Sequence, residues 1–122
     1  MDTKKICEHL RAFAAARDWD QFHNAKNLVM ALSGEVGELT EIFQWLTPEQ
    51  SSVVMETEQL AEQVRDELAD VTLYVLRLCD VLGVDLESAI WAKVAKNAAK
   101  YPVELAKGRA TKYSDLKGLK DD

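Results

Sequence analysis

Glycine and proline are scarce in this sequence, with five glycines and two prolines among 122 residues. All-β folds need frequent turns, and these two residues supply most of the backbone conformations that turns require. Their scarcity disfavours a β-sandwich or a β-barrel and favours a helical chain. Apolar residues make up 48% of the sequence, which is enough for a hydrophobic core. Because the length is typical of a single domain, we expect one domain over residues 1–122.

The low cysteine content and the lack of long apolar runs exclude further classes of protein. Neither of the two cysteines belongs to a Cys-x-x-Cys pair, so no disulfide framework or zinc site is expected, and a reducing compartment fits. The first residues lack the apolar segment of a signal peptide. No apolar run approaches the roughly 18 residues of a transmembrane helix. We therefore expect a cytoplasmic protein that has no membrane partner.

Basic residues are too few for a protein that binds nucleic-acid polymers, since the net charge is −6. The charge is also unevenly distributed. Residues 1–90 hold 17 acidic and 7 basic side chains, whereas residues 91–122 hold 4 acidic and 8 basic ones. The basic tail, from about residue 103, suits either solubility or the binding of a smaller anion. We expect no nucleic-acid polymer as a partner.

Hydrophobic periodicity and capping residues predict an all-α fold with a protomer like a four-helix bundle. The four helices are expected at residues 3–17, 24–45, 58–82 and 86–100. Gly83 is expected to end the third helix, and Asp85 to cap the fourth. The linker over residues 46–57 has room for a short helical turn capped by Thr47. The tail over residues 103–122 is expected to be irregular, or to become ordered only against a neighbour.

The third predicted helix is apolar on two sides. One side carries a long stripe, and Leu73 and Leu76 lie on the other side of the helical wheel. The stripe consists of Leu60, Val64, Leu68, Val71, Val75, Leu78 and Leu82. A helix that is apolar on two sides is buried on two sides. Either a partner subunit or the fourth helix is therefore expected to cover the second side.

Four carboxylates lie on or beside the apolar stripes of the second and third helices. At 100° per residue, Glu35 falls inside the stripe that begins at Leu28, and Glu38 falls at its edge. Glu67 and Asp70 hold the equivalent places on the third helix, 32 residues later in the sequence. If the two helices pack antiparallel by their apolar faces, both acidic pairs meet near the core.

Such a group of carboxylates needs a counter-charge. Unpaired charges near the core cost several kcal/mol each, and neither stripe carries a lysine or an arginine. Hard divalent cations are the simplest solution. Ligation by carboxylates alone suits Mg²⁺ or Mn²⁺, which keep bound waters and also accept phosphate oxygens.

Other interpretations of these carboxylates stay open. Glu-x-x-Glu pairs are common on solvated helix faces, where they have no special function. Di-iron bundles also place carboxylates inward, but they need Glu-x-x-His on two helices, and neither His9 nor His23 follows a glutamate in this way. An EF-hand loop is absent. A non-catalytic helical module, whose acidic stripes bind a cation or a partner, is the alternative from another functional class.

The acidic motifs resemble those of a known family. The all-α nucleoside triphosphate pyrophosphohydrolases of the MazG-like superfamily have a signature similar to Glu35-x-x-Glu38 followed, after a gap of 28 residues, by Glu67-x-x-Asp70. Further motifs resemble the dCTP pyrophosphatase branch of this superfamily. They are Arg17-Asp18-Trp19, Phe22-His23, Gly34-Glu35-Val36-Gly37-Glu38-Leu39, Phe43-Gln44-Trp45, Tyr101-Pro102 and Lys112-Tyr113. The resemblance covers residues 8–116.

The resemblance implies a reaction. Enzymes of this family hydrolyse a nucleoside triphosphate between the α- and β-phosphates, and dCTP or a modified dCTP is the expected substrate, with nucleotide-pool cleansing as the role. A related enzyme that prefers dUTP or another damaged nucleotide is the alternative within the class. The resemblance also implies a homodimer or homotetramer, and it places Mg²⁺ or Mn²⁺ on Glu35, Glu38, Glu67 and Asp70. Glu38 is the candidate for orienting or deprotonating the attacking water.

The resemblance further implies a nucleotide pocket. The residues that match the family's pocket positions are Trp19, His23, Asn27, Trp45, Tyr74, Lys93, Asn97 and Tyr101. In the dCTP pyrophosphatase branch, the two tryptophans flank the base. Without the resemblance, loop tryptophans that only fill the core are an equal expectation. The chain departs from the pattern at Leu10, where vertebrate members carry a histidine, and this difference bears on the base preference.

Overall fold

The computed structural model describes residues 1–116, and all regular structure in that range is helical. The elements are, in chain order, α1 (Thr3–Ala16), η1 (Asp20–Phe22), α2 (Ala25–Phe43), α3 (Pro48–Ser52), η2 (Val54–Glu56), α4 (Glu58–Leu82), α5 (Leu86–Lys100) and α6 (Val103–Ala106). Here η denotes a 3₁₀ helix. The predicted all-α class is confirmed. Within residues 1–116, no helix combines the length and apolar character of a bilayer-spanning segment.

Local capping explains why the long helices begin and end where they do. The Asn24 side chain accepts a hydrogen bond from the backbone amide of Asn27 at 2.9 Å and so starts α2. Asp85 caps α5 in the same way, through the amide of Ser88 at 3.1 Å. Gly83 ends α4 with a φ of 69°, in the left-handed region that favours glycine. The bounds of α4 and α5 match the predicted ranges, and α1 and α2 end one or two residues earlier than predicted.

The linker between α2 and α4 is more ordered than a simple loop. Thr47 and Gln50 form a reciprocal capping box, with hydrogen bonds of 3.1 and 2.9 Å, at the start of α3. The 3₁₀ turn η2 follows and buries Val54. The short helical turn expected after Thr47 is therefore present.

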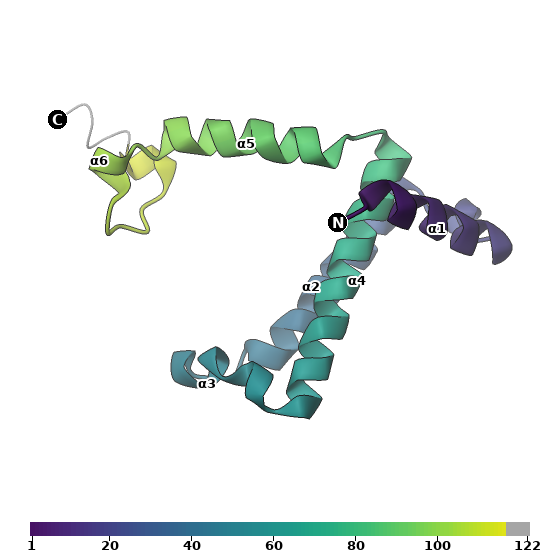
Figure 1. The fold of residues 1–122 in the computed structure, drawn as a ribbon, viewed down its shortest axis with the longest axis horizontal. Helices are drawn as coiled ribbons and strands as arrows, with labels where there is room; N and C mark the ends of the chain where they lie inside the picture. Colours follow the sequence, from purple (N-terminus) through teal and green to yellow (C-terminus); the bar gives the residue numbers. More distant parts are fainter. Residues whose placement is uncertain (117–122) are drawn as a thin grey trace. The chain divides into compact units, whose positions relative to one another are not determined.

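Contacts divide the chain into two compact units, the first over Met1–Val84 and the second beginning at Asp85. In the first unit, α2 and α4 lie antiparallel, side by side, and form the main packing interface (Figure 1). Leu28 of α2 and Val64 of α4 are buried in it. This antiparallel pairing is the arrangement that brings the acidic motifs of the two helices together.

The helix α1 covers part of the second side of α4, a possibility that the sequence did not suggest; Leu76 is buried, whereas Leu73 stays 36% exposed. The helix α1 lies across the C-terminal end of α4 (Figure 1). The Cys7 thiol donates a hydrogen bond to the Leu76 carbonyl at 3.8 Å, and Leu76 is buried. Arg11 of α1 also donates to Asp80 of α4 at 2.7 Å. These contacts fix the N-terminal helix on the central pair.

The predicted apolar stripes are not buried along their whole length. Val36 on α2 is 44% exposed and Leu68 on α4 is 51% exposed, although both lie on stripes predicted to face the core. The physical reason is that one helix covers only a narrow strip of its neighbour. Residues at the margin of the stripe stay in solvent within the single chain.

The second unit contains α5, α6 and a further helical turn over residues 113–116. Leu116 is buried, and the Lys100 ammonium lies 5.6 Å from the centre of the Tyr113 ring. The tail up to residue 116 is thus partly helical, unlike the irregular segment expected. The part of the predicted tail over residues 117–122 lies outside the described residues.

Candidate metal centre and nucleotide pocket

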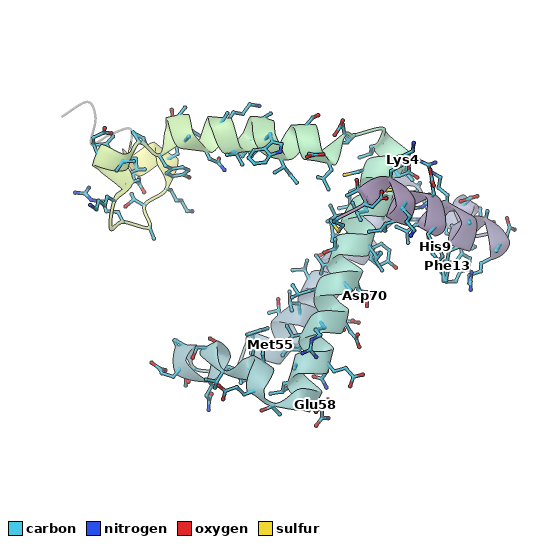
Figure 2. All side chains as sticks on the ribbon, in the orientation of Figure 1. Lys4, His9, Phe13, Met55, Glu58 and Asp70 are labelled. Carbon is cyan, nitrogen blue, oxygen red and sulfur yellow. The ribbon has the colours of Figure 1, made fainter. Side chains whose placement is uncertain are left out.

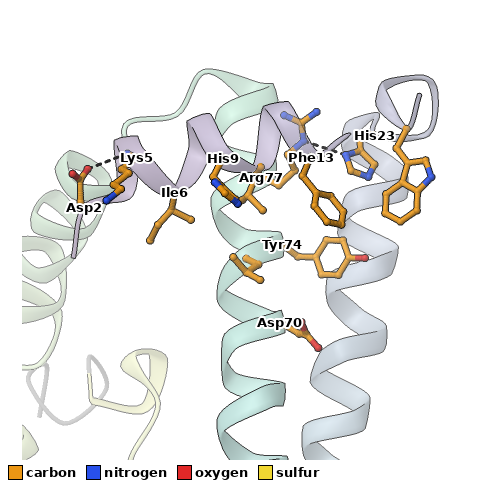
Figure 3. A pocket seen from close by; sticks show the side chains of 12 residues that line it. Asp2, Lys5, Ile6, His9, Phe13, His23, Asp70, Tyr74 and Arg77 are labelled. Atoms are coloured by element: carbon orange, nitrogen blue, oxygen red, sulfur yellow. Dashed lines mark hydrogen bonds between the residues drawn. The ribbon is translucent and has the colours of Figure 1, made fainter. Parts of the chain in front are cut away.

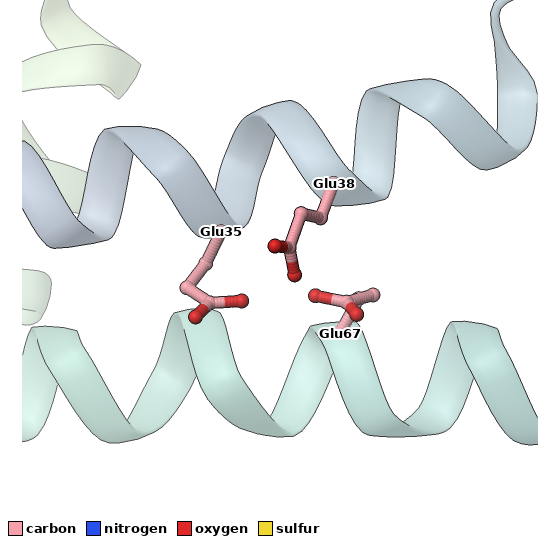
Figure 4. A group of neighbouring side chains, drawn as sticks. All are labelled: Glu35, Glu38 and Glu67. Atoms are coloured by element: carbon pink, nitrogen blue, oxygen red, sulfur yellow. The ribbon is translucent and has the colours of Figure 1, made fainter.

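Three carboxylates from two helices meet at the interface of α2 and α4. Glu35 and Glu38 come from successive turns of α2, and Glu67 comes from the facing turn of α4 (Figure 4). Each contributes one oxygen, and the three oxygens all lie within 4.8 Å of one another. We call these three residues the carboxylate cluster. The i, i+3 spacing puts the first two on one face of α2, and antiparallel packing supplies the third.

The cluster lacks the counter-charge that buried carboxylates need. Oε2 of Glu35 and Oε2 of Glu67 are shielded from solvent and have no hydrogen-bond donor within the part of the chain that the structure describes. Burial, followed by the close carboxyls of Glu67 and Glu38, raises the pKa of Glu35 to about 7. Burial also raises the pKa of Glu67. Orphaned buried oxygens and an all-oxygen donor set fit a hard divalent cation.

Asp70 lies one helical turn beyond Glu67 on α4, outside the cluster itself. Its carboxylate lines the neighbouring pocket instead, and its negative charge contributes to the raised pKa of Glu35 (Figure 3). Asp70 therefore lies between the carboxylate cluster and the pocket, close enough for its negative charge to influence both.

The pocket next to Asp70 is formed by α1, the loop around η1, and α4. Its volume is about 750 Å³, which lies within the usual range for small-molecule sites. Its walls are mostly apolar, and His9 and Phe13 lie on the side of α1 that borders it (Figures 2 and 3). The lining residues are Asp2, Lys5, Ile6, His9, Leu10, Phe13, Trp19, His23, Asp70, Leu73, Tyr74 and Arg77.

Aromatic contacts hold the Trp19 ring in place at this pocket. The Phe13 ring meets it edge to face, with centroids 5.7 Å apart at an angle of 70°, and the His23 ring lies 6.2 Å away. The Arg17 guanidinium covers the Phe13 ring at 3.5 Å. Trp19 stays 44% exposed, so it can present a ring surface to a planar ligand.

A buried arginine ties the loop around η1 to α4. Arg77 donates from Nε to His23 Nδ1 at 3.1 Å, and from its terminal nitrogens to Asp20 at 3.0 Å and Asp80 at 3.3 Å. Burial and the positive charge of Arg77 lower the pKa of His23. The hydrogen bond from Arg11 lowers the pKa of Asp80. The loop that carries Trp19 and His23 is thereby anchored to the helix that carries Asp70.

Comparison with known proteins decides the family. The model of the MazG-like family matches residues 30–116, which include both acidic motifs. The chain belongs to the MazG-like family. The family resemblance found in the sequence is thus confirmed.

Individual MazG-like relatives are similar over most of the chain. Proteins named dCTP pyrophosphatase 1 match over 104 residues, or 85% of this chain, with 43% identity in Bos taurus and 41% in Homo sapiens. This chain spans about three fifths of the length of these curated relatives. The crystal structure of a pyrophosphatase from Archaeoglobus fulgidus DSM 4304 superimposes with a TM-score of 0.77 at 38% identity, covering 84% of this chain and 94% of that one.

The structure gathers some of the predicted MazG-like site residues and separates others. Trp19, His23 and Tyr74 line one pocket together with Asp70. Asn27 does not line it. Its side chain donates to the Phe22 carbonyl at 3.0 Å and so supports the loop.

Trp45 is separated from the pocket by the length of α2. It follows the C-terminal end of this helix and is 86% exposed, whereas His23 precedes the N-terminal end. A helix of 19 residues is about 28 Å long. The Trp45 and Trp19 of a single chain therefore cannot flank the same base.

The remaining predicted residues lie in the second unit. Lys93 and Asn97 are one turn apart on α5, and Tyr101 is its C-terminal cap residue. The positive charge of Lys100, about two turns further along α5, is the main cause that lowers the pKa of Lys93. These side chains form a basic and polar face of α5.

Sequence reasoning missed two parts of the pocket. Ile6 and Phe13, on the apolar face of α1, line the cavity but were not among the predicted pocket residues. Arg77 was not singled out, although a basic residue between Leu76 and Leu78 in an apolar helix is unusual. A basic residue in an apolar helix was the signal that could have identified this part of the pocket, because a buried arginine needs acidic or acceptor partners.

Proposed function

We propose that this protein is a divalent-metal-dependent nucleoside triphosphate pyrophosphohydrolase that acts on dCTP or a base-modified dCTP. The products are the monophosphate and pyrophosphate. The proposal is carried by one observation, a carboxylate cluster with two orphaned oxygens beside an aromatic-walled pocket. The names of the relatives, dCTP pyrophosphatase 1 and a pyrophosphatase, support the same reaction class.

In this proposal, the carboxylate cluster and Asp70 hold Mg²⁺ or Mn²⁺. A bound ion would neutralise the phosphate chain and lower the pKa of a coordinated water. Glu35 and Glu67 are the more buried members of the cluster and suit ligation, whereas Glu38 is exposed and can accept a proton from water. We assign Glu38 to orienting or deprotonating the attacking water.

The base is proposed to bind in the pocket, against Trp19 and close to His23 and Tyr74. The Trp19 ring is held by its neighbours, so stacking costs little conformational entropy. The apolar α1 wall, with Leu10 in place of a polar residue, suits a base with an apolar substituent. We therefore expect a base-modified dCTP to be a substrate in addition to dCTP.

We further propose that the active form is a homodimer or homotetramer. Trp45 lies too far along α2 to reach the pocket of its own chain, so a neighbouring copy would bring it to the base. Val36 and Leu68 are exposed apolar residues on the central helices, which supports a covering subunit. Lys93, Asn97 and Tyr101 of α5 are proposed to contact the nucleotide in this assembly. We also propose a cytoplasmic role in cleansing the nucleotide pool.

A direct assay tests the proposal. The protein is incubated with Mg²⁺ and separately with dCTP, 5-methyl-dCTP, dUTP and the other common triphosphates, and pyrophosphate and monophosphate are quantified. Equal amounts of dCMP and pyrophosphate are expected from dCTP. Release of orthophosphate and dCDP would place the cut elsewhere, and no turnover of any triphosphate would favour a non-catalytic module. Glu35→Gln should abolish turnover, whereas Glu62→Gln, an exposed control on α4, should not.

A further inference from the structure

Arg77 is the one charged residue that is buried among those the structure describes, with 8% of its surface exposed. Its guanidinium uses all three nitrogens on three different partners. Asp20 and Asp80 accept from the terminal nitrogens, and the ring of His23 accepts from Nε. Burying a charge is costly, so a site of this kind needs every partner in place.

The contact with His23 has a consequence for the position of a proton. The Nε atom of an arginine carries one hydrogen, is never an acceptor and does not lose its proton in proteins. His23 Nδ1, at 3.1 Å from it, must therefore be the acceptor and carry no hydrogen. A neutral imidazole has one N–H, so the hydrogen of His23 is on Nε2.

We propose that Arg77 is a positioning residue that holds His23 in the Nε2–H tautomer, so that His23 offers a hydrogen-bond donor to an acceptor atom of the bound base. The inference rests on the proposed function in one respect, namely that the pocket holds a nucleotide base. Pyrimidines carry such an acceptor at the O2 carbonyl. Cytosine carries a second one at N3, where uracil has an N–H instead.

The surroundings of Arg77 oppose the alternative states of His23. With the hydrogen on Nδ1, two donors would face each other at 3.1 Å, and a doubly protonated ring would add a second positive charge beside the guanidinium. Asp20 favours a charged ring by its negative charge, but it already pairs with Arg77 at 3.0 Å. Asp80 forms ion pairs with both Arg11 and Arg77.

Nuclear magnetic resonance of the unmodified protein tests the tautomer without any substrate. The chain has two histidines, so labelling them with ¹⁵N gives two spin systems, and His9→Gln assigns the signals. At neutral pH, the Nδ1 of His23 is expected to show the downfield shift of an unprotonated ring nitrogen, and Nε2 that of a protonated one. A protonated Nδ1, or a fast average of the two tautomers, would overturn the inference.

Two arginine variants then test the role in binding. Arg77→Met removes the donor and is expected to restore a mixture of tautomers at His23 and to raise KM for dCTP about three- to tenfold, the effect of one hydrogen bond, with a smaller change in kcat. Arg65→Met is the matched control, since it removes an exposed arginine of the same helix that is not among the partners of His23. It should leave both readouts unchanged.

The outcomes separate this inference from the proposed function. If the wild type hydrolyses dCTP but Arg77→Met changes neither the tautomer nor KM, the positioning role is wrong. A raised KM with an unchanged tautomer would also refute it. If no triphosphate is hydrolysed at all, the proposed function fails while the resonance result still decides the tautomer. Should Arg77→Met not fold, the wild-type spectrum decides the tautomer, and Arg77→Lys, which keeps the positive charge without the guanidinium, takes its place in the KM measurement.

Discussion

Magnesium should stabilise this protein more strongly as the pH rises from 6 to 8. In the metal-free chain, the pKa of Glu35 is raised from 4.5 to about 7. The protonated carboxyl therefore stabilises the metal-free fold fully below about pH 4.5, and this contribution is lost as the pH rises through 7. The cation binds the deprotonated carboxylate, so the stabilisation that Mg²⁺ provides increases as the pH rises.

The size of the effect follows from linkage. A cation at 100 times its Kd stabilises the fold by about 2.7 kcal/mol. For a chain of 122 residues, this corresponds to a rise in Tm of about 10 °C, at about 4 °C per kcal/mol. At pH 6, about nine in ten Glu35 carboxyls carry a proton, which lowers the apparent affinity about tenfold. The same concentration of Mg²⁺ should then give roughly half the shift in Tm.

Differential scanning calorimetry at pH 6, 7 and 8, with Mg²⁺ and with EDTA, measures these shifts. The variant Glu35→Gln should unfold at a temperature that no longer responds to Mg²⁺, because it lacks both the charge and the titrating proton. Glu62→Gln, an exposed control on the same helix as Glu67, should respond like the wild type. A Mg²⁺ shift that is independent of pH, or that survives in Glu35→Gln, would show that the ion binds elsewhere.

Three further predictions concern packing, the pocket and assembly. Leu28→Ala should lower the free energy of unfolding by about 2–5 kcal/mol in urea titrations, because Leu28 is 1% exposed at the interface of α2 and α4. Trp19→Ala should raise KM for dCTP while the Mg²⁺-dependent rise in Tm is kept; an unchanged KM would remove Trp19 from the base site. Leu68→Glu should reduce the molar mass measured by light scattering, whereas Glu62→Gln should not.

The helices were predictable from the sequence because their signals are local. The hydrogen bonds that start α2 and α5 come from side chains three residues away, and Gly83 ends α4 by its own backbone conformation. The pairing of α2 and α4 was predictable for a different reason. Two acidic motifs at equivalent places on apolar stripes predict that the two stripes pack against each other.

The pocket was less predictable because it depends on how α1 crosses α4. An apolar stripe on a helix indicates that something covers it, but it does not distinguish a protein core from a ligand cavity. Phe13 follows the same periodicity as core residues and yet lines the cavity at 41% exposure. The exposure of Val36 and Leu68 was not predictable for the same reason, because the width of the buried strip on a helix depends on how many helices pack against it.

The two halves of the site differ in what a single chain can supply. The carboxylate cluster is complete within α2 and α4, because both of its helices belong to one compact unit. The base pocket has one tryptophan fixed on its wall and the other beyond the far end of α2, about 28 Å away along the helix. Cation binding should therefore persist in a dissociated protomer. Nucleotide affinity should decrease when the protein is diluted and the assembly dissociates. Titrating Mg²⁺ and dCTP against Leu68→Glu would show this difference in a single variant.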